Sequence, residues 1–335
     1  IFSSRLVIIG FMLVAVVFWF RLIHSLYDQH VGFFSSLLFI TSHMVVRYSR
    51  VTMTEISALA FMMLAIYFFH KSTITGRISN IVLCILSLAL SLYARLILLF
   101  LVPLFIIWLL MEKPVRKQSR KVVCLLSASI ILSLVPLVIL TLSLAKGNVA
   151  WVFQHPGQQF SLDWLAAYPK VLWRLQLAHP VFLLSMLGLL AALVRRGKRE
   201  LFFLIWILLL YLELIVLGPA DGRYSIYWIP PFCLFAALVP KLFGTRALKI
   251  SLLLILMGAS GFQLYLAAKM TPEYIEGYEE AARTVVDARV GIVLYSASFD
   301  SGYFVFFVRK YDTEKRTIVL LSDKILATYK LGSVV

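Results

Sequence analysis

Three stretches of the sequence place charged residues directly beside long apolar runs. Charged side chains next to or inside an apolar segment are costly in lipid, so such residues are candidates for function. Several guanidinium groups on one face could clamp a phosphate, because Arg offers paired donors and does not lose its proton. A nearby carboxylate could bind a metal, orient a sugar hydroxyl or act as a base. The stretches are VVRYSRVTMTEISALAF, SLYARLILLFLVP and GPADGRYSIYWIPP, with Arg47, Arg50, Glu55, Arg95, Asp221 and Arg223.

Each of these residues also has a purely structural interpretation. Glu55 completes the T-x-x-E spacing of a capping box at a helix start. Arg47 can extend to a membrane interface, and Arg95 can anchor a helix end there. Asp221 and Arg223 can pair with each other in a turn. The sequence leaves these interpretations open beside the functional ones.

The elements that must position these residues are membrane spans. The chain is 61% hydrophobic and 14% charged, with a mean hydropathy of +0.93, which excludes an ordinary water-soluble domain. Backbone polar groups in lipid must be satisfied within the span, so we expect helices. We predict an all-α polytopic membrane protein with about ten transmembrane helices. The spans are roughly residues 6–23, 32–46, 56–70, 79–93, 96–111, 122–144, 181–194, 201–217, 225–240 and 249–268.

Basic residues between the spans predict their orientation. The connections at 71–77, 113–121, 195–199 and 241–249 alternate along the chain and carry most of the loop Lys and Arg. Such loops are cytoplasmic. The net charge of +16 therefore indicates topology rather than a nucleic-acid partner. We expect the three charged stretches and both chain ends on the external face of the cell membrane.

Two segments depart from the pattern of spans. Residues 146–180 form a long external loop with several Trp, typical of an amphipathic interfacial helix. After residue 268 the sequence alternates between helical and extended patterns, in GYEEAARTVVDAR, GIVLYS, DSGYFVFFVRKY and RTIVLL. We predict a transmembrane domain over 1–268 and a small extracytoplasmic α/β segment over 269–335. Because a span opens almost at the first residue, we expect a missing upstream piece, and a truncated C-terminal segment.

Residues that often bind metals or nucleotides show no ligand spacing. Cys84, Cys124 and Cys233 lie in separate apolar stretches, and we expect free, buried thiols. The six His residues lack the i, i+4 pairing of a helical metal site. Neither a Walker A loop nor a G-x-G-x-x-G motif occurs, so a nucleotide-driven pump is unsupported. The sequence indicates no cofactor and leaves a divalent metal at the charged stretches open.

The charged stretches, in this order, resemble a known family. RYSRVTMTEISALAFMMLAIYFF resembles the Arg, four residues, acidic residue and apolar span of GT-C glycosyltransferases of the protein O-mannosyltransferase and aminoarabinose-lipid A transferase type. LSLALSLYARLILLFLVPLFII is similar to the span pair that follows, and GRYSIYWIPPFCLFAAL to the later Arg-Tyr element with its proline-containing span. The resemblance covers most of the chain through short, degenerate motifs.

The resemblance implies an inverting membrane glycosyltransferase. It would move a sugar from a polyprenyl-phosphate donor to a lipid, glycan or protein acceptor at the extracytoplasmic face. Carried onto this sequence, Arg95 and Arg223 form a phosphate clamp with Tyr224 beside it. Arg50 and Glu55 shape the sugar or acceptor site.

Glu55 matches the second acidic position of the family, where Asp is commoner, and is the candidate catalytic residue. Asp221 joins the candidate substrate-binding and phosphate-binding residues. The principal acidic residue of the family lies in a first external loop, and this chain begins where the second span would. We therefore expect the principal base to lie outside this chain.

Two other classes of protein remain open at this stage. A transporter or flippase for an anionic or lipid-linked substrate would line a path through the membrane with charged residues and would show paired halves. The sequence shows no such repeat. A non-catalytic membrane scaffold is the third alternative.

Overall fold

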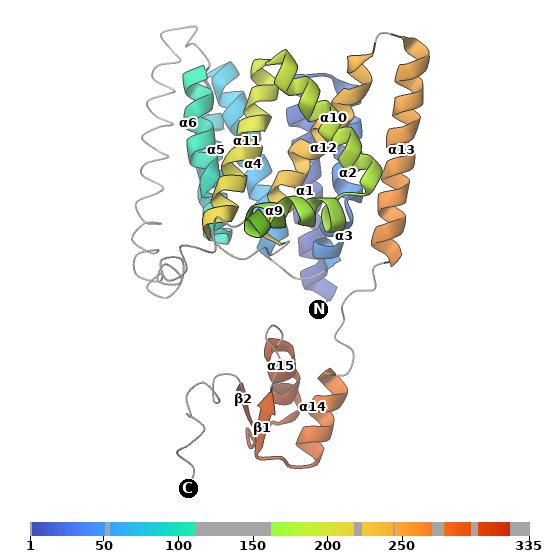
Figure 1. The fold of residues 1–335 in the computed structure, drawn as a ribbon. Helices are drawn as coiled ribbons and strands as arrows, with labels where there is room; N and C mark the ends of the chain where they lie inside the picture. The colour runs from blue at the N-terminus through green and yellow to red at the C-terminus, as the bar shows by residue number, and fades with distance from the viewer. Residues whose placement is uncertain are drawn as a thin grey trace. The chain divides into compact units, whose positions relative to one another are not determined.

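The protein forms two compact units, Ile1–Met270 and Thr271–Val335. A computed structural model describes residues 2–50, 54–111, 162–217, 223–243, 245–269, 278–295 and 301–321. The first unit is a bundle of apolar helices, and the second combines two helices with two strands (Figure 1). The predicted class, an all-α polytopic membrane protein with a small α/β segment, is confirmed.

Helices of the first unit coincide with the predicted spans, apart from span 122–144, which lies outside the described residues. Single-turn segments of tighter or wider geometry adjoin some of them: 3-10 turns at Leu96–Phe100, Tyr224–Trp228 and Val239–Leu242, and a π turn at Leu172–Gln176. The helices are α1 (Phe2–Leu26), α2 (Gln29–Thr41), α3 (His43–Arg50), α4 (Thr54–Thr75), α5 (Ile78–Ala94), α6 (Leu101–Met111), α9 (Leu162–Val171), α10 (His179–Arg195), α11 (Lys198–Leu217), α12 (Ile229–Leu238) and α13 (Arg246–Lys269).

Several of these helices are long and apolar enough to cross a membrane. Within the described residues there are four: Arg5–Leu26, Thr54–Thr75, Tyr224–Leu242 and Arg246–Lys269. Helices α2 and α3 together give a fifth, bent by 60°. Other predicted spans are shorter apolar helices of 10–17 residues, among them α5 and α10. Because a helix rises 1.5 Å per residue, these shorter helices approach only the lower limit of a full span.

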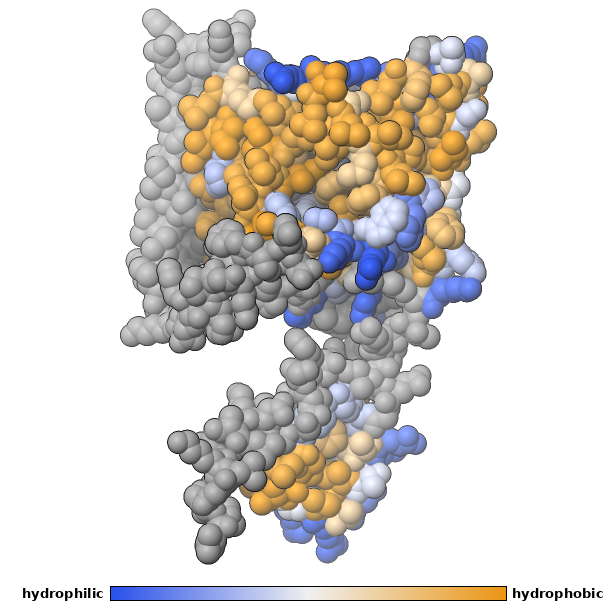
Figure 2. Space-filling view, in the orientation of Figure 1, coloured by the Kyte–Doolittle hydropathy of each residue, from blue (hydrophilic) through white to orange (hydrophobic). Residues whose placement is uncertain are grey.

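The outer surface of the bundle is apolar, as lipid requires. Figure 2 shows a broad hydrophobic band over the helices, with hydrophilic residues above and below it. Large side chains such as Leu110 and Val194 are mostly exposed within this unit. Aromatic rings fill the interior, where Trp19 meets both Phe203 and Trp206 edge to face. The distribution excludes water from the interior and presents hydrocarbon to the surroundings.

The helix directions define two ends of the bundle (Figure 1). The turns from α4 to α5 and from α10 to α11, and the connection into α13, lie at one end, which we call the basic end. It carries three of the predicted basic connections, and the fourth, 113–121, lies outside the described residues. The opposite end, where α4 begins, α5 ends and α9 runs across the bundle, is called the site end.

The second unit follows the predicted alternation of helix and strand. It contains α14 (Tyr278–Asp287), β1 (Ile292–Tyr295), α15 (Ser301–Tyr311) and β2 (Ile318–Leu321). The two strands are parallel, and Ile292 pairs with Ile318. Ala282, Phe304 and Val308 form its buried core. In the first unit, Cys84 and Cys233 are free and buried as expected, and Cys124 lies outside the described residues.

Helices α10 and α12 approach each other closely at Gly188. A Cβ atom built there would lie 1.9 Å from the backbone oxygen of Phe235, so backbone rather than a flexible side chain must move. We expect Gly188→Ala to destabilise the bundle by about 1–3 kcal/mol through overpacking. Thermal unfolding in detergent measures the effect.

The matched control is Gly258→Ala on α13, because a Cβ atom there meets no atom within 4 Å. This control should retain the wild-type unfolding temperature. Equal unfolding temperatures for the two variants would contradict the close packing of α10 on α12.

Candidate active site at one end of the bundle

A buried ion pair joins the two helices that meet at the site end. Glu55 lies in the first turn of α4 and its side chain is 0% exposed, whereas Arg95 directly follows α5 and is 29% exposed. Because α4 and α5 pack antiparallel, the start of one helix lies beside the end of the other. Arg95 Nη2 donates to Glu55 Oε1. The negative charge also lies at a helix N-terminus, where the helix dipole stabilises it.

A tyrosine ring from a third element contacts the same arginine. The guanidinium carbon of Arg95 lies 6.0 Å from the centroid of the Tyr224 ring. The guanidinium carbon of Arg223 lies 5.8 Å from the same centroid. Both separations are within the range of cation–π attraction. Tyr224 is therefore a shared neighbour of the two arginines, which are 128 positions apart in the chain.

Several polar atoms of this cluster have no hydrogen-bond partner among the described residues. They are Glu55 Oε2, Arg95 Nε and the hydroxyl of Tyr227, and all are buried. Tyr227 also interacts electrostatically with Glu55 and Arg95. An unpaired buried polar atom costs about 1–3 kcal/mol, so each of these atoms favours a ligand or water beside it. The arrangement offers donors for an anion and one acceptor oxygen.

The structure brings four of the six sequence-predicted residues into this cluster: Glu55, Arg95, Arg223 and Tyr224. Arg50 is the last residue of α3, also at the site end, but its side chain lies outside the described part of the chain. Asp221 lies outside the described residues altogether.

Comparison with known proteins gives both a family and a fold. Residues 1–140 match the family described as dolichyl-phosphate-mannose-protein mannosyltransferase. The crystal structure of an Archaeoglobus fulgidus oligosaccharyltransferase, tethered to an acceptor peptide containing the NVT sequon, superposes with a TM-score of 0.52 at 12% identity. The alignment covers 92% of this chain and 47% of the oligosaccharyltransferase, so the chain spans about half the length of that enzyme. No curated protein matches in sequence.

The chain has a GT-C glycosyltransferase fold. The resemblance inferred from the charged stretches is thereby supported by a family match over residues 1–140 and by a similar fold over most of the chain. Within this GT-C fold, the family match includes the Glu55–Arg95 pair and ends before Arg223. The residues that complete the cluster thus come from the part of the GT-C chain that the family match does not reach.

Two residues near the cluster escaped the sequence analysis. Tyr227 follows Tyr224 by three residues and looked like one aromatic among many. Glu213 is a lone carboxylate in the apolar run LLLYLELIVL of α11, and the cost of a charge in lipid should have identified it. Its Oε2 accepts from the backbone N–H of Phe100 at 3.0 Å. Glu213 therefore holds the 3-10 turn that follows Arg95.

The described residues do not supply a metal site. No group of three or more His, Cys, Asp or Glu side chains that could hold an ion occurs among them. Glu55, the one carboxylate of the cluster, already pairs with Arg95.

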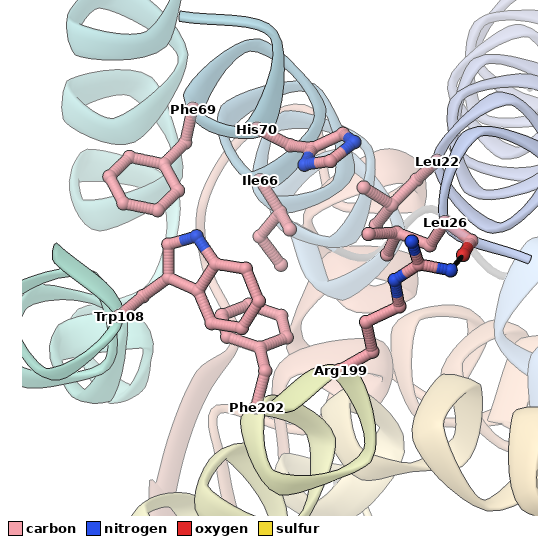
Figure 3. A pocket seen from close by; sticks show the side chains of 8 residues that line it. All are labelled: Leu22, Leu26, Ile66, Phe69, His70, Trp108, Arg199 and Phe202. Carbon is pink, nitrogen blue, oxygen red and sulfur yellow. Dashed lines mark hydrogen bonds between the residues drawn. The ribbon is translucent and has the colours of Figure 1, made fainter. Parts of the chain in front are cut away.

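A small cavity at the basic end belongs to packing rather than to binding. Figure 3 shows the rings of Phe69, Trp108 and Phe202 beside it, with Arg199 donating to the backbone oxygen of Leu26. Its volume is about 10 Å³, at the lower limit for one water molecule. This cavity is too small for a sugar or a lipid phosphate.

The ion pair predicts a specific pattern of stability. Arg95→Ala leaves the Glu55 carboxylate buried and unpaired, so we expect a loss of about 3–5 kcal/mol. Adding Glu55→Gln removes the buried charge, and the double variant should recover part of that loss. Unfolding in detergent of wild type, both single variants and the double variant gives the coupling energy. Additive effects would show that the two side chains do not interact.

Proposed function

We propose that the protein is a membrane glycosyltransferase that moves a sugar from a polyprenyl-phosphate carrier to a hydroxyl group of a lipid, glycan or protein. The observation that carries this proposal is a cluster at one end of an apolar bundle, formed by Glu55, Arg95, Tyr224 and Arg223. Buried polar atoms of Glu55 and Arg95 have no hydrogen-bond partner among the described residues. The GT-C fold and the mannosyltransferase match support it.

The two arginines form the donor side of the site. Arg95 and Arg223 share Tyr224 as a neighbour, and a phosphate between them would receive charge-assisted hydrogen bonds from both. The unpaired Nε of Arg95 is one such donor. When the bond from the sugar carbon to the phosphate oxygen breaks, the electron pair stays on that oxygen. Positive charge held in place there lowers the energy of the departing lipid phosphate.

Glu55 forms the acceptor side. One of its oxygens is occupied by Arg95, and the other, Oε2, is buried without a hydrogen-bond partner among the described residues, so it has the capacity to accept from a sugar or acceptor hydroxyl. The acceptor oxygen forms the new bond to the sugar carbon from the face opposite the phosphate, which inverts that centre. The hydroxyl proton passes to a base, and we propose Glu55 as the residue that orients this hydroxyl.

The arrangement of charge favours an enzyme over a transporter. A transport path would place charged side chains along the depth of the bundle. Among the described residues of the first unit, Glu55 is the only fully buried Asp, Glu, Lys or Arg, and it lies at the site end. We place this end on the extracytoplasmic side of the cell membrane, opposite the basic end, with the segment after Lys269 on the same side.

A transfer assay tests the proposal. The protein in native membranes is supplied with labelled polyprenyl-phosphate sugars, beginning with mannose, and incorporation into lipid, glycan and protein is counted. We expect Arg95→Ala and Arg223→Ala each to lower transfer at least about 100-fold, because each removes a group that stabilises developing charge.

The matched control is Arg246→Ala, an exposed arginine at the start of α13 on the basic end. It should leave transfer unchanged. Full transfer by both clamp variants would refute the clamp. Uptake of the labelled donor into vesicles without any transfer would instead identify a transporter.

A further inference from the structure

An opening at the site end shares no residue with the Glu55–Arg95 cluster. It is a groove of about 420 Å³, formed by the start of α3, the π turn, the start of α10 and the end of α13. Helix α13 packs against α3 and α10, so these segments meet although they are distant in sequence. The lining residues are His43, Arg174, Leu177, Ala178, His179, Phe262, Leu266 and Lys269.

The polar lining of the groove suits an anion. Arg174, His179 and Lys269 are exposed at its edge, and none of the eight lining residues is acidic. His43 is different, because it is only 3% exposed. Neither of its ring nitrogens has a hydrogen-bond partner among the described residues. A buried imidazole that lines an opening and has an unused N–H favours an acceptor oxygen within that opening.

The floor of the groove is held rigidly. Ser42, beside His43, donates to the backbone oxygen of Gln176 at 2.8 Å. The indole N–H of Trp228 donates to the side-chain oxygen of Gln176 at 2.7 Å. The backbone N–H of Ala178 donates to Gln263 Oε1 at 3.3 Å. The π turn that carries Arg174 is therefore fixed from several sides, and a ligand would meet a preformed site.

The apolar wall of the groove continues onto the outer surface of the bundle. Phe262 and Tyr265 on α13 are 43% and 52% exposed, respectively. Leu177 and Ala178 close the inner side and are buried. A ligand with a charged head and a hydrocarbon chain fits both features, because the head meets the cations while the chain lies along α13.

We infer that this groove binds the phosphate group of a membrane lipid. Arg174 and Lys269 supply charge-assisted hydrogen bonds to the phosphate oxygens, and His43 donates one more from its buried N–H. Lys269 by itself would be an ordinary interfacial residue at a helix end. The buried His43, whose ring nitrogens have no hydrogen-bond partner among the described residues, and the rigid turn that carries Arg174 distinguish a binding site from that arrangement. The inference goes beyond the proposed function, since it requires no sugar transfer.

A cross-linking experiment tests the site. A polyprenyl phosphate with a photoactivatable group next to the phosphate is added to the protein in detergent without any sugar donor. Wild type should give cross-links to the α13 peptide containing Phe262 and Leu266. The double variant Arg174→Gln/Lys269→Gln should lower the yield of this peptide at least about tenfold, because two charge-assisted contacts are lost. His43→Asn should lower it to a smaller extent.

Matched controls separate this effect from unfolding and from general charge. Arg246→Gln/Lys249→Gln removes two exposed cations from the other end of α13 and should keep the wild-type yield. Each variant must retain its unfolding temperature for the comparison to count. An uncharged polyprenol probe should label this peptide weakly and equally in all variants. Unchanged phosphate-dependent labelling in the Arg174/Lys269 double variant would overturn the inference.

Competition identifies the source of the phosphate. Displacement of the probe by unlabelled polyprenyl phosphate alone assigns the groove to the carrier lipid. Displacement by phosphatidylglycerol as well assigns it to anionic membrane lipids, and displacement by inorganic phosphate shows that the head group is sufficient. The clamp variant Arg223→Ala should leave this cross-link intact. A failure of the proposed transfer reaction is therefore distinguishable from a failure of the groove.

Discussion

The structure at the site end depends on keeping one carboxylate charge inside an apolar bundle. Glu55 has no exposed side-chain surface, and an uncompensated charge there would be strongly destabilising. Arg95 provides the compensating charge, and the N-terminus of α4 adds the favourable end of a helix dipole. This requirement fixes the start of α4 against the end of α5. The Tyr224 ring lies within cation–π range of both Arg95 and Arg223. Arg223 lies at the start of a span that is distant in the sequence.

The same end of the bundle concentrates the departures from regular helix. The chain bends at Ser42, is extended at Arg95, forms a π turn at Leu172–Gln176 and enters α12 through a 3-10 turn. Irregular backbone at membrane depth is tolerated only where protein or a water-filled opening satisfies its polar groups. The hydrogen bond from the Ser42 hydroxyl to the backbone oxygen of Gln176 meets that requirement at the π turn. Elsewhere the frame is mostly regular helix, with a 3-10 turn at Val239–Leu242, and the irregular turns at the site end present the polar groups.

Two regions of different chemistry result. The cluster around Glu55 combines an acceptor oxygen with guanidinium donors, as a group transfer to a hydroxyl requires. The groove beside α13 has donors and an apolar wall but no carboxylate among its lining residues, which suits retention of a lipid phosphate rather than chemistry on it. The two are connected through Gln176, whose amide donates to Ser225, the residue after Tyr224. An enzyme that acts on lipid-linked substrates can use one region for the transfer and the other to retain the lipid.

The sequence by itself predicted the spans that the described residues contain, the small α/β unit and the charged residues Glu55, Arg95 and Arg223, because these follow from local composition. Apolar length predicts a helix, and a charge beside lipid stands out whatever surrounds it. The pairing of Glu55 with Arg95, the shared Tyr224 ring and the groove that His43 lines were decided only by the tertiary structure. They depend on which helices pack together. Because these helices are apolar on nearly every face, their sequences carry little information about their packing partners. Glu213 could have been identified from the sequence as a lone charge in an apolar run. Its role in holding the turn after Arg95 is visible only from the contact between α11 and that turn.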